Sequence, residues 1–329
     1  MPTLLFITKN LNGASTRYRA LNYLDQLQQS GWNTRQWTSK EGLSSYPRLI
    51  SCLLKSDIVM IQRKLLSTPL LLLVRLLSKK LVYDFDDAIF LKDSGKPSKH
   101  RLQLFSDAVR KSNAVFAGNH YLASKAELYN SNVVLLPTTV NMKRYLPAPK
   151  RDGSHFVDLV WIGSSSTRKY LEGLIPALEE LGKRHKQLRL KIIADFDLPL
   201  SHMETLAIHW SSDTEALELG NSDIGIAPMT DDPWTQGKCA LKVIQYMAAG
   251  LPVISSDAGT NGEVVVDNVT GLLVNSHKEW IAAVECLLED ETLRHSMAAN
   301  GLKRAEQLYS QDSGFKVMQE TFAQLLEEN

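Results

Sequence analysis

The chain has 329 residues, of which 44% are hydrophobic and 22% are charged, and its formal net charge is +1. This length predicts two domains of ordinary size, and the near-neutral charge excludes the basic field expected of a nucleic-acid-binding protein. The three cysteines are isolated and lack metal-ligand spacing, which indicates a reducing compartment, no disulfide framework and no metal site.

Short apolar runs alternate with helix-length segments through the first half of the chain. We predict a buried strand at "TLLFIT", which is too short for the core of a signal peptide, and further strands at "DIVMI", "KLVYDF", "AVFAG" and "NVVLLP". An amphipathic helix is expected over residues 17–30. This alternation predicts an α/β domain with a parallel sheet.

The segment "YLPAPKRDGSH", residues 145–155, has the composition of a linker, and the alternation then begins again. Strands are expected at "VDLVWIG", "LRLKIIAD", "DIGIAP" and "PVISS", with a helix over 167–185 and three helical segments after Ser276. We therefore expect two doubly wound, Rossmann-like domains, residues 1–150 and 151–309, which face each other across a cleft.

A leucine-rich run, "LLSTPLLLLVRLLSKK", lies in the first half and is too short to span a bilayer. One interpretation is a buried helix. The other is a peripheral contact with the inner face of a membrane, because Arg75, Lys79 and Lys80 flank the leucines. Either interpretation is compatible with the cytoplasmic location that we expect.

Three polar loops follow strands of the second half. Gly163 in "GSSSTRK" permits a close backbone approach, and Ser164 and its neighbours either contact a ligand or cap the next helix. The second loop is "TDDPWTQGK", and the third is "SSDAGTNGE", where Gly259 and Gly262 permit a backbone nest for an anion. Three such loops on one sheet favour a binding site over coincidental turns.

The second polar loop leads into a predicted helix at Ala240–Ala249. We expect Lys238, Lys242 and Gln245 to share one face of this helix. Cations near a helix N-terminus oppose the macrodipole by about 0.3–1 kcal/mol, and a bound anion would reverse this effect.

The span from Val157 to Val274 resembles the donor-binding half of the retaining glycosyltransferases of family 4, which have the GT-B fold. "GKCALKVIQYMAAGLPVISSDAGTNGEVV" and "TGLLV" are similar to the central block and closing strand of that family. "WIGSSSTRKYLEGL" resembles its first strand and helix. In the first half, "AVFAGNHYLASKAELY" and "LLPTTVNMKRY" resemble a strand end and a connector, so the resemblance covers nearly the whole chain.

This resemblance implies transfer of a sugar, with retention, from a nucleotide-diphosphate sugar to an acceptor hydroxyl, without a metal or another cofactor. It implies an acceptor that is a glycan or is lipid-linked, and a role in the synthesis of cell-surface polysaccharide or lipid-linked glycan. The C-terminal helix, residues 310–329, would pack back on the first domain.

The resemblance also implies roles for individual residues. Lys242 and Lys169 would bind the donor pyrophosphate. The other donor-binding residues would be Gly163, Ser164, Lys238, Gln245, Gly259, Thr260, Asn261 and Glu263.

The chain departs from the family at its two glutamates, which are separated by seven residues and contact the sugar and the ribose. Here their positions hold Gly237 and Gln245. Gln245 can still accept a ribose hydroxyl proton, as an uncharged partner. The sugar contact is left unassigned, and Ser164 replaces a phosphate-binding arginine of the family.

The first half is expected to bind the acceptor. In "NLNGASTRYRALNYL", Gly13 lies in a loop, and Arg17 and Arg19 are expected at the start of the following helix. The two arginines either bind an anion, which is the donor diphosphate or a phosphate of the acceptor, or they are solvated surface residues.

The stretch "YDFDDAIF" places Asp84, Asp86 and Asp87 at the end of a strand. The resemblance places Asp86 near the anomeric carbon, where it would orient the acceptor hydroxyl. The alternative is that Asp86 caps the next helix. An Asp-x-Asp pair also holds the metal in GT-A transferases, but a complete donor half elsewhere argues against that role here.

Two other functions stay open. One is a nucleotide-sugar epimerase or hydrolase with the same fold. The other is a non-catalytic binding protein derived from a transferase, which the residues Gly237 and Gln245 favour.

Overall fold

The computed structural model describes residues 1–10, 13–38, 42–145 and 155–327. The chain forms two units. The first unit contains Met1–Thr139, Asp232–Cys239 and the C-terminal segment from Gln311, and the second contains Val140–Asp231 and Ala240–Ser310. The domain boundary predicted between residues 150 and 151 lies outside the described residues.

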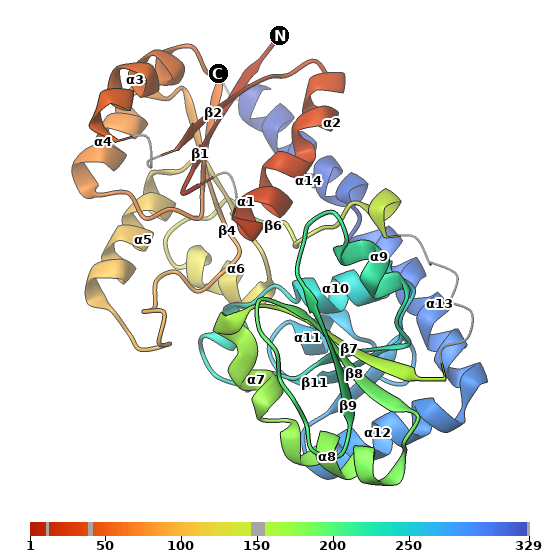
Figure 1. Ribbon diagram of the computed structural model, residues 1–329. Coiled ribbons are helices and arrows are strands. Elements are labelled where there is room, and N and C mark those ends of the chain that lie inside the picture. The colour runs from red at the N-terminus through yellow and green to blue at the C-terminus, as the bar shows by residue number, and fades with distance from the viewer. Residues whose placement is uncertain (11–12, 39–41, 146–154, 328–329) are drawn as a thin grey trace. The chain divides into compact units, whose positions relative to one another are not determined.

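The sheet of the first unit has six parallel strands in the order β2-β1-β3-β4-β5-β6 (Figure 1). The strands are β1 (Thr3–Thr8), β2 (Asn33–Thr38), β3 (Ile58–Gln62), β4 (Lys80–Phe85), β5 (Ala114–Ala117) and β6 (Val133–Leu135). All five predicted strands are confirmed. The sixth, β2, was not predicted because it is a polar edge strand with Trp37 as its one buried residue.

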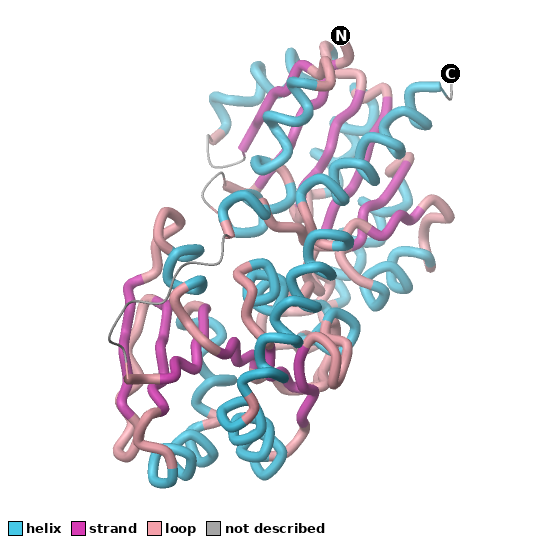
Figure 2. Tube along the Cα trace, turned by 90° about the vertical axis from the view of Figure 1, so that its right-hand side faces the viewer, coloured by secondary structure: helices cyan, strands magenta, loops and turns pink. Residues whose placement is uncertain are grey.

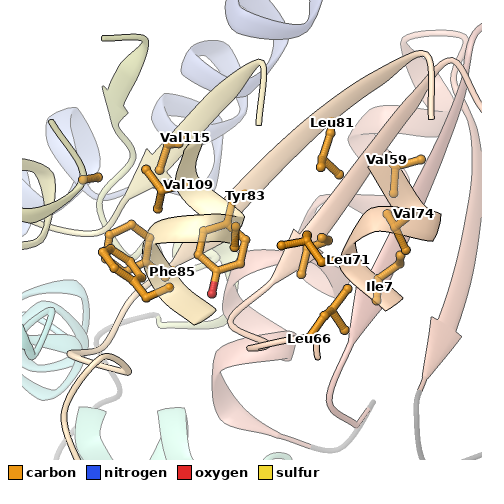
Figure 3. Close-up of a cluster of buried hydrophobic side chains, with 14 of the residues drawn as sticks. Ile7, Val59, Leu66, Leu71, Val74, Leu81, Tyr83, Phe85, Val109 and Val115 are labelled. Atoms are coloured by element: carbon orange, nitrogen blue, oxygen red, sulfur yellow. The ribbon is translucent and has the colours of Figure 1, made fainter. Parts of the chain in front are cut away.

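Side chains alternate between the two faces of this sheet, and both faces are buried. On one face Leu5 and Ile7 pack under α3 (Tyr46–Leu54), α4 (Thr68–Leu77), α5 (Lys99–Lys111) and α6 (His120–Glu127). Figure 3 shows part of this cluster, with Ile7, Leu71 of α4 and Val109 of α5 labelled. On the other face Leu4 and Phe6 pack under α2 (Leu24–Gln29) and α14 (Gln311–Glu327). Burial on both faces is the reason that parallel strands have continuously apolar sequences.

The C-terminal helix α14 belongs to the first unit. Phe322 of this helix is fully buried, and its ring lies 5.4 Å from that of Trp32 and 6.0 Å from that of Phe116. Met318 and Leu325 bury the rest of the same apolar face. α14 is therefore a structural part of the first unit, although it follows the second unit in the sequence.

The predicted helix at 17–30 is wrong in its extent. The segment forms α1 (Ala14–Arg19), a 3-10 turn η1 (Leu21–Tyr23) and α2. As a result, Arg17 and Arg19 lie in the last turn of α1 rather than at a helix N-terminus. Basic side chains in a last turn are favoured by the helix dipole, so the electrostatic argument for an anion at this position fails.

The sheet of the second unit also has six parallel strands, in the order β12-β11-β10-β7-β8-β9. They are β7 (Val157–Ile162), β8 (Leu188–Ala194), β9 (Glu204–His209), β10 (Ile224–Ala227), β11 (Val253–Ser256) and β12 (Gly271–Val274). The predicted strands are confirmed, whereas β9 was not predicted because it is an edge strand of mixed polarity. Figure 2 shows the strands of each unit side by side between helices.

The helices of the second unit are α7 (Arg168–Glu172), α8 (Ile175–Arg184), α9 (Glu215–Gly220), α10 (Leu241–Ala248), α11 (Asn261–Val264), α12 (His277–Glu289) and α13 (Glu291–Leu308). The helix predicted over 167–185 is divided into α7 and α8 near Gly173. The three helices predicted after Ser276 are confirmed as α12, α13 and α14.

Each sheet has one point where the strand order changes direction. From β1 the chain adds β2 on one side and then β3 on the other, and from β7 it adds β8 and β9 on one side and β10 on the other. In doubly wound sheets, ligands bind beyond the carboxyl ends of the strands at such points. The topology therefore directs attention to the loops after β1 and β3 and to those after β7 and β10.

The leucine-rich run forms α4, which is only half buried. Leu71 and Val74 face the core, whereas Leu72 and Leu76 are 49% and 81% exposed. Among the residues that the structure describes, none of the helices is both long and apolar enough to cross a bilayer.

Candidate functional site

Lys242 lies at the point where the strand order of the second sheet changes direction. It is the second residue of α10, the helix that follows β10, and its Nζ donates to Oγ1 of Thr167 over 3.3 Å. Nζ also lies 3.9 Å from the ring centroid of Trp161 on β7. A cation–π contact and a hydrogen bond thus hold this ammonium beside the loop after β7.

The first turn of α10 supplies backbone donors beside this cation. The N-cap residue is Ala240, whose side chain cannot accept a hydrogen bond from the first turn. Ala240 also has a φ of +50°, a conformation that L-residues other than glycine adopt at some energetic cost. Lys242 and the helix N-terminus together can bind an anion.

The loop after β7 is held by its own hydrogen bonds. Ser164 and Thr167 form a capping box over the turn η5 (Ser165–Thr167). The backbone N–H and the hydroxyl of Ser165 each donate to Asp195 over 2.8 Å. The capping alternative therefore holds for Ser164 at the turn η5, whereas α7 itself has no side-chain cap. Lys169 follows in α7, exposed, with its Nζ 4.9 Å from the ring centroid of Tyr170.

Gly163 has a packing role that the sequence did not reveal. A Cβ at this position would lie 2.3 Å from Cη2 of Trp161. Glycine is required here because the indole of Trp161 occupies the space that a side chain would fill. From the sequence we had expected the missing side chain to let a ligand approach the backbone. The same indole lies under the ammonium of Lys242.

The loop after β11 has a fixed backbone. Gly259 has a φ of +51°, which glycine adopts without strain. Thr260 and Asn261 are buried, and Nδ2 of Asn261 donates to Oγ of Ser255 over 2.9 Å. Glu263 is exposed in α11.

The predicted polar stripe of Lys238, Lys242 and Gln245 is wrong. Lys238 precedes α10 and belongs to the first unit, where its Nζ lies 3.0 Å from Oδ2 of Asp87 and 4.6 Å from the ring centroid of Trp234. Lys238 directly follows the turn η6 (Thr235–Gly237), and the left-handed Ala240 lies between it and the helix.

Gln245 is on α10 but faces the interior of the second unit. Its Nε2 donates to Oη of Tyr145 over 2.9 Å, and Tyr145 is buried as well.

Gly237, where the resemblance implies a glutamate, has no room for a side chain. A Cβ there would lie 2.6 Å from Cβ of Ala88 and 2.7 Å from its backbone nitrogen. Nδ2 of Asn119 holds the same segment through the carbonyl oxygens of Gln236 and Lys238, at 2.9 and 3.1 Å. Any side chain at position 237 would therefore require the backbone of Ala88 to shift.

Arg19 fits neither of its two expected roles. It is 1% exposed, and its Nε lies 2.9 Å from each carboxylate oxygen of Asp84, while Nη1 donates to the carbonyl oxygen of Leu136 over 2.8 Å. Arg19 is therefore a buried structural residue. Arg17 donates to Oη of Tyr18 over 2.9 Å, with its guanidinium 4.6 Å from the ring centroid of Tyr18.

Asp86 lies just beyond β4 and is held by side chains from the neighbouring loops. One carboxylate oxygen accepts from Oγ of Ser15 over 2.7 Å, and Ser15 accepts from Nε2 of Gln62 over 2.7 Å. The helix-capping alternative is wrong, because the next helix, α5, is capped by Ser98. Asp86 is 12% exposed at its side chain, so it can still reach a ligand.

Arg63 is a residue that the sequence analysis missed. It follows β3 with a φ of +50°, which costs an L-residue about 1–2 kcal/mol. Its guanidinium forms an ion pair with Asp87, and its Nε lies 3.7 Å from the carboxylate of Asp86. Backbone strain beside paired charges is typical of functional sites.

A cavity of about 740 Å³ opens at the point where the strand order of the first sheet changes direction. Its wall comes from the loops after β1 and β3, the start of α1, part of α5, and Trp234. Of the predicted acceptor residues, Gly13 lines it, whereas Arg17 and Arg19 do not. Residues that we had not predicted form most of its polar wall: Lys9, Asn10, Ser15, Gln62, Arg63, Lys64, Asp93, His100 and Arg101.

Comparison with known proteins identifies the class. Residues 157–290 match the family model of the Glycosyl transferases group 1. The chain is similar to D-inositol 3-phosphate glycosyltransferase of Corynebacterium aurimucosum, with 29% identity over 124 residues, which are 37% of this chain and 26% of that protein. The match thus spans about a quarter of the length of that relative.

Solved structures match over nearly the whole chain. Sucrose-phosphate synthase from Thermosynechococcus elongatus has a TM-score of 0.76 at 15% identity and is covered in full by this chain. HepE from Anabaena, in complex with UDP-glucose, has a TM-score of 0.73 at 14% identity, with 98% of this chain and 99% of HepE covered. The protein has the GT-B fold, and residues 157–290 are a group 1 glycosyltransferase domain, as the sequence predicted.

The buried ion pair of the first unit generates a stability prediction. Removal of one partner of such a pair costs about 3–5 kcal/mol, because the other charge is left buried and unpaired. We expect Arg19→Met and Asp84→Leu each to lower the free energy of unfolding by about this amount, and the double variant to lose less than the sum of the two. Calorimetric unfolding of the four proteins measures this coupling, and strictly additive losses would contradict it.

The packing of Gly237 generates a second prediction. Gly237→Ala places a methyl group against the backbone of Ala88 and should lower the free energy of unfolding by about 1–3 kcal/mol, as overpacking does. Gly173→Ala is the control, because a Cβ there would have its nearest contact at an ordinary 3.4 Å. Equal melting temperatures for the two variants would show that Gly237 is not constrained.

Proposed function

We propose that this protein transfers a sugar from a nucleotide-diphosphate sugar to an acceptor hydroxyl. The main observation is the position of Lys242 in the group 1 domain, at the start of α10 and beside the loop after β7. The similarity to a glycosyltransferase and to the UDP-glucose complex of HepE supports the same chemistry.

Lys242 is the residue to which we assign the donor diphosphate. Its ammonium, the hydroxyl of Thr167 and the first N–H groups of α10 form a set of donors on one edge of the sheet. A fixed cation stabilises the negative charge that grows on the diphosphate as it leaves, and this term is a large part of transition-state stabilisation. The packing of the ammonium on Trp161 keeps it in place before the donor binds.

Other parts of the donor would contact the neighbouring loops of the same unit. Lys169 and Ser164 are exposed near the loop after β7, and Gly259, Thr260 and Glu263 follow β11. The backbone between Gly259 and Asn261 is assigned to the sugar or phosphate. Gln245 is buried and Lys238 is ion-paired, so both are weaker candidates for donor binding than the sequence indicated.

We propose a retaining reaction in which the departing phosphate takes the proton of the acceptor hydroxyl. Asp86 of the first unit, held by Ser15 and close to Arg63, would orient that hydroxyl. This mechanism needs no dedicated base. It also needs no cofactor, because Lys242 supplies the positive charge that a metal ion provides in other transferases.

A glycan or lipid-linked acceptor, used in the synthesis of a cell-surface polymer, is consistent with the surface of the first unit. The exposed leucines of α4, Leu72 and Leu76, lie one helical turn apart. Ile50 and Leu54 of the adjacent α3 repeat this arrangement. With the basic residues near them, these side chains would bind the surface of an anionic membrane.

A non-catalytic binding protein is the second candidate. It is favoured by one observation: the segment at Gly237 excludes the side chain that contacts the sugar in the family. Binding of a nucleotide without transfer or hydrolysis of any sugar would support it.

Substitution of Lys242 tests the donor assignment. Loss of a charged hydrogen-bond partner weakens binding by about 1.5–3 kcal/mol, so Lys242→Ala should bind its nucleoside diphosphate about tenfold to hundredfold more weakly. Thermal-shift and calorimetric titrations with UDP, GDP, ADP, TDP and their sugars, without metal, measure this effect. Lys278→Ala, at an exposed lysine of α12, is the control, and unchanged affinity in Lys242→Ala would contradict the assignment.

Vesicle binding tests the membrane contact. The variant Leu72→Glu/Leu76→Glu should no longer sediment with vesicles of phosphatidylglycerol and phosphatidylcholine, because charges replace the inserted side chains. Leu128→Glu serves as the control, since Leu128 is 71% exposed in the same unit but follows α6. Equal binding by both variants would refute a role for α4.

A further inference from the structure

The indole of Trp161 lies near the end of β7 and is fully buried in the core of the second unit. The ammonium of Lys242 lies over this ring, with Nζ 3.9 Å from the ring centroid. The ring also packs against Phe196, with 5.6 Å between the two centroids. This side chain therefore connects the hydrophobic core to the cation at the start of α10.

The N–H group of this indole makes tryptophan a costly choice for packing alone. Nε1 of Trp161 is buried and has no hydrogen-bond partner among the residues that the structure describes. A buried donor without an acceptor lowers the free energy of unfolding, and buried tryptophans usually have a partner for this group. Phenylalanine or leucine would fill the core without this cost. The indole differs from them in its π face, which binds cations best of the aromatic side chains.

Gly163 shows that the backbone is adapted to the same ring. A Cβ at position 163 would lie 2.3, 2.6 and 2.8 Å from Cη2, Cζ2 and Cζ3 of Trp161, which form the outer edge of the indole. A phenylalanine ring at position 161 would end short of these atoms. The glycine is therefore needed for a tryptophan in particular.

The helix α10 is fixed on the sheet by contacts that do not involve the lysine. Tyr246 lies one turn after Lys242. Its Oη accepts from the backbone N–H of Ile162 over 3.0 Å and donates to the carbonyl oxygen of Ile226 over 3.1 Å. A Cβ on Gly225 would lie 2.5 Å from the Tyr246 ring, so the helix packs closely on β10. The indole therefore determines the position of the Lys242 side chain rather than that of the helix.

We propose that Trp161 and Gly163 are positioning residues for the diphosphate of the donor. The indole holds the ammonium of Lys242 beside the hydroxyl of Thr167, and Gly163 leaves the space that the indole needs. Neither residue contacts the ligand itself, and both act through Lys242. The identity of the ligand rests on the proposed function, whereas the position of the ammonium does not.

A neutral ring holds a cation without cancelling its charge. A carboxylate also holds an ammonium group, but it neutralises the charge, as Asp87 does for Lys238 in the first unit. The quadrupole of an indole attracts the ammonium, and this contact leaves the formal charge available to an anion. Positioning by an aromatic ring therefore suits a lysine that has to bind a negatively charged ligand.

Substitution of the indole separates its π face from its volume. Trp161→Phe keeps a smaller π face, and Trp161→Leu keeps an apolar side chain without one. We titrate the full chain calorimetrically with UDP, GDP, ADP and TDP. For those that the wild-type protein binds, we expect Trp161→Leu to bind about threefold to thirtyfold more weakly, and Trp161→Phe to lose less. Wild-type affinity in Trp161→Leu, or equal losses in the two variants, would overturn the proposal.

Trp280→Leu is the matched control, because it removes another buried indole from the core of the same unit. Both leucine variants lose a buried ring, so a lower melting temperature is expected of both. Weaker nucleotide binding is expected only at position 161. An equal loss of affinity in Trp280→Leu would show that core packing alone explains the effect and would reject the role of Trp161.

The double variant Trp161→Phe/Gly163→Ala tests the part played by Gly163. Gly163→Ala alone should displace the indole and weaken nucleotide binding about as much as Trp161→Leu does. Because the shorter phenylalanine ring leaves room for the methyl group, the double variant should bind as Trp161→Phe does, and the two effects should not add. Additive losses would show that Gly163 acts independently of the ring and is not a positioning residue.

A measurement without ligand distinguishes failure of this proposal from failure of the proposed function. Protons above an indole experience its ring current, so the Hε protons of Lys242 should resonate upfield in NMR spectra of protein labelled with ¹³C at lysine. Lys242→Ala assigns the signal, which should move to the ordinary lysine position in Trp161→Leu and part of the way in Trp161→Phe. The phenylalanine variant keeps the test valid should the leucine variant not fold.

The two readouts together decide between the outcomes. An upfield signal in a protein that binds none of the four nucleoside diphosphates would support the position of the ammonium and reject the donor assignment. An ordinary lysine signal in the wild-type protein would refute the positioning role, whatever the protein binds.

Discussion

The buried ion pair between Arg19 and Asp84 fixes the polar edge of the first unit. Arg19 ends α1, Asp84 lies on β4, and the carbonyl oxygen of Leu136, just after β6, accepts from the same guanidinium. Burial raises the pKa of Asp84 to about 6 although the charge of Arg19 acts in the opposite direction. Burial of the pair therefore costs free energy of folding. Its structural role is to hold α1, β4 and the segment after β6 in one geometry, rather than to add stability.

The neighbouring polar groups depend on this geometry. Asp86 follows Asp84 by two residues and accepts from Ser15, which lies on the same short helix as Arg19. Thr16 of that helix donates to Gln62 at the end of β3. A change in the angle of α1 would move Ser15 and Thr16 together, so the ion pair positions the side chains around the cavity without touching it.

The same edge also contacts the segment Asp232–Cys239, which belongs to the first unit but lies between two segments of the second unit in the sequence. Lys238 pairs with Asp87, and Sγ of Cys239 donates to the carbonyl oxygen of Asp86 over 3.3 Å. Burial raises the pKa of this thiol, so Cys239 stays neutral and acts as a small packed side chain. These contacts bring Gly237 against Ala88, where a side chain has no room.

The sequence predicted the fold better than the site, and the reasons are local. Buried parallel strands have continuous apolar runs, which made β1, β3 and β4 evident, whereas β2 and β9 are edge strands with mixed patterns. Lys242 could be proposed because its segment resembles a family motif, and the structure places it beside Thr167. The role of Arg19 was predicted wrongly. A sequence pattern cannot distinguish a buried arginine from a solvated one when the partner carboxylate, here Asp84, is 65 residues away.

Lys9 and Lys64 show why the sequence could not predict the cavity of the first unit. Each is a single lysine after a strand, 55 residues apart in sequence, and only the order β1-β3 makes them neighbours on one edge. At the corresponding edge of the second sheet, between β7 and β10, Lys242 lies at the start of a helix, and its ammonium packs on the ring of Trp161. An ammonium held against an indole is preorganised for a ligand that must be stabilised as its charge grows, which is the role that the proposed function gives Lys242. This arrangement is the reason that we propose Lys242, rather than a cation of the first sheet, for the chemical step.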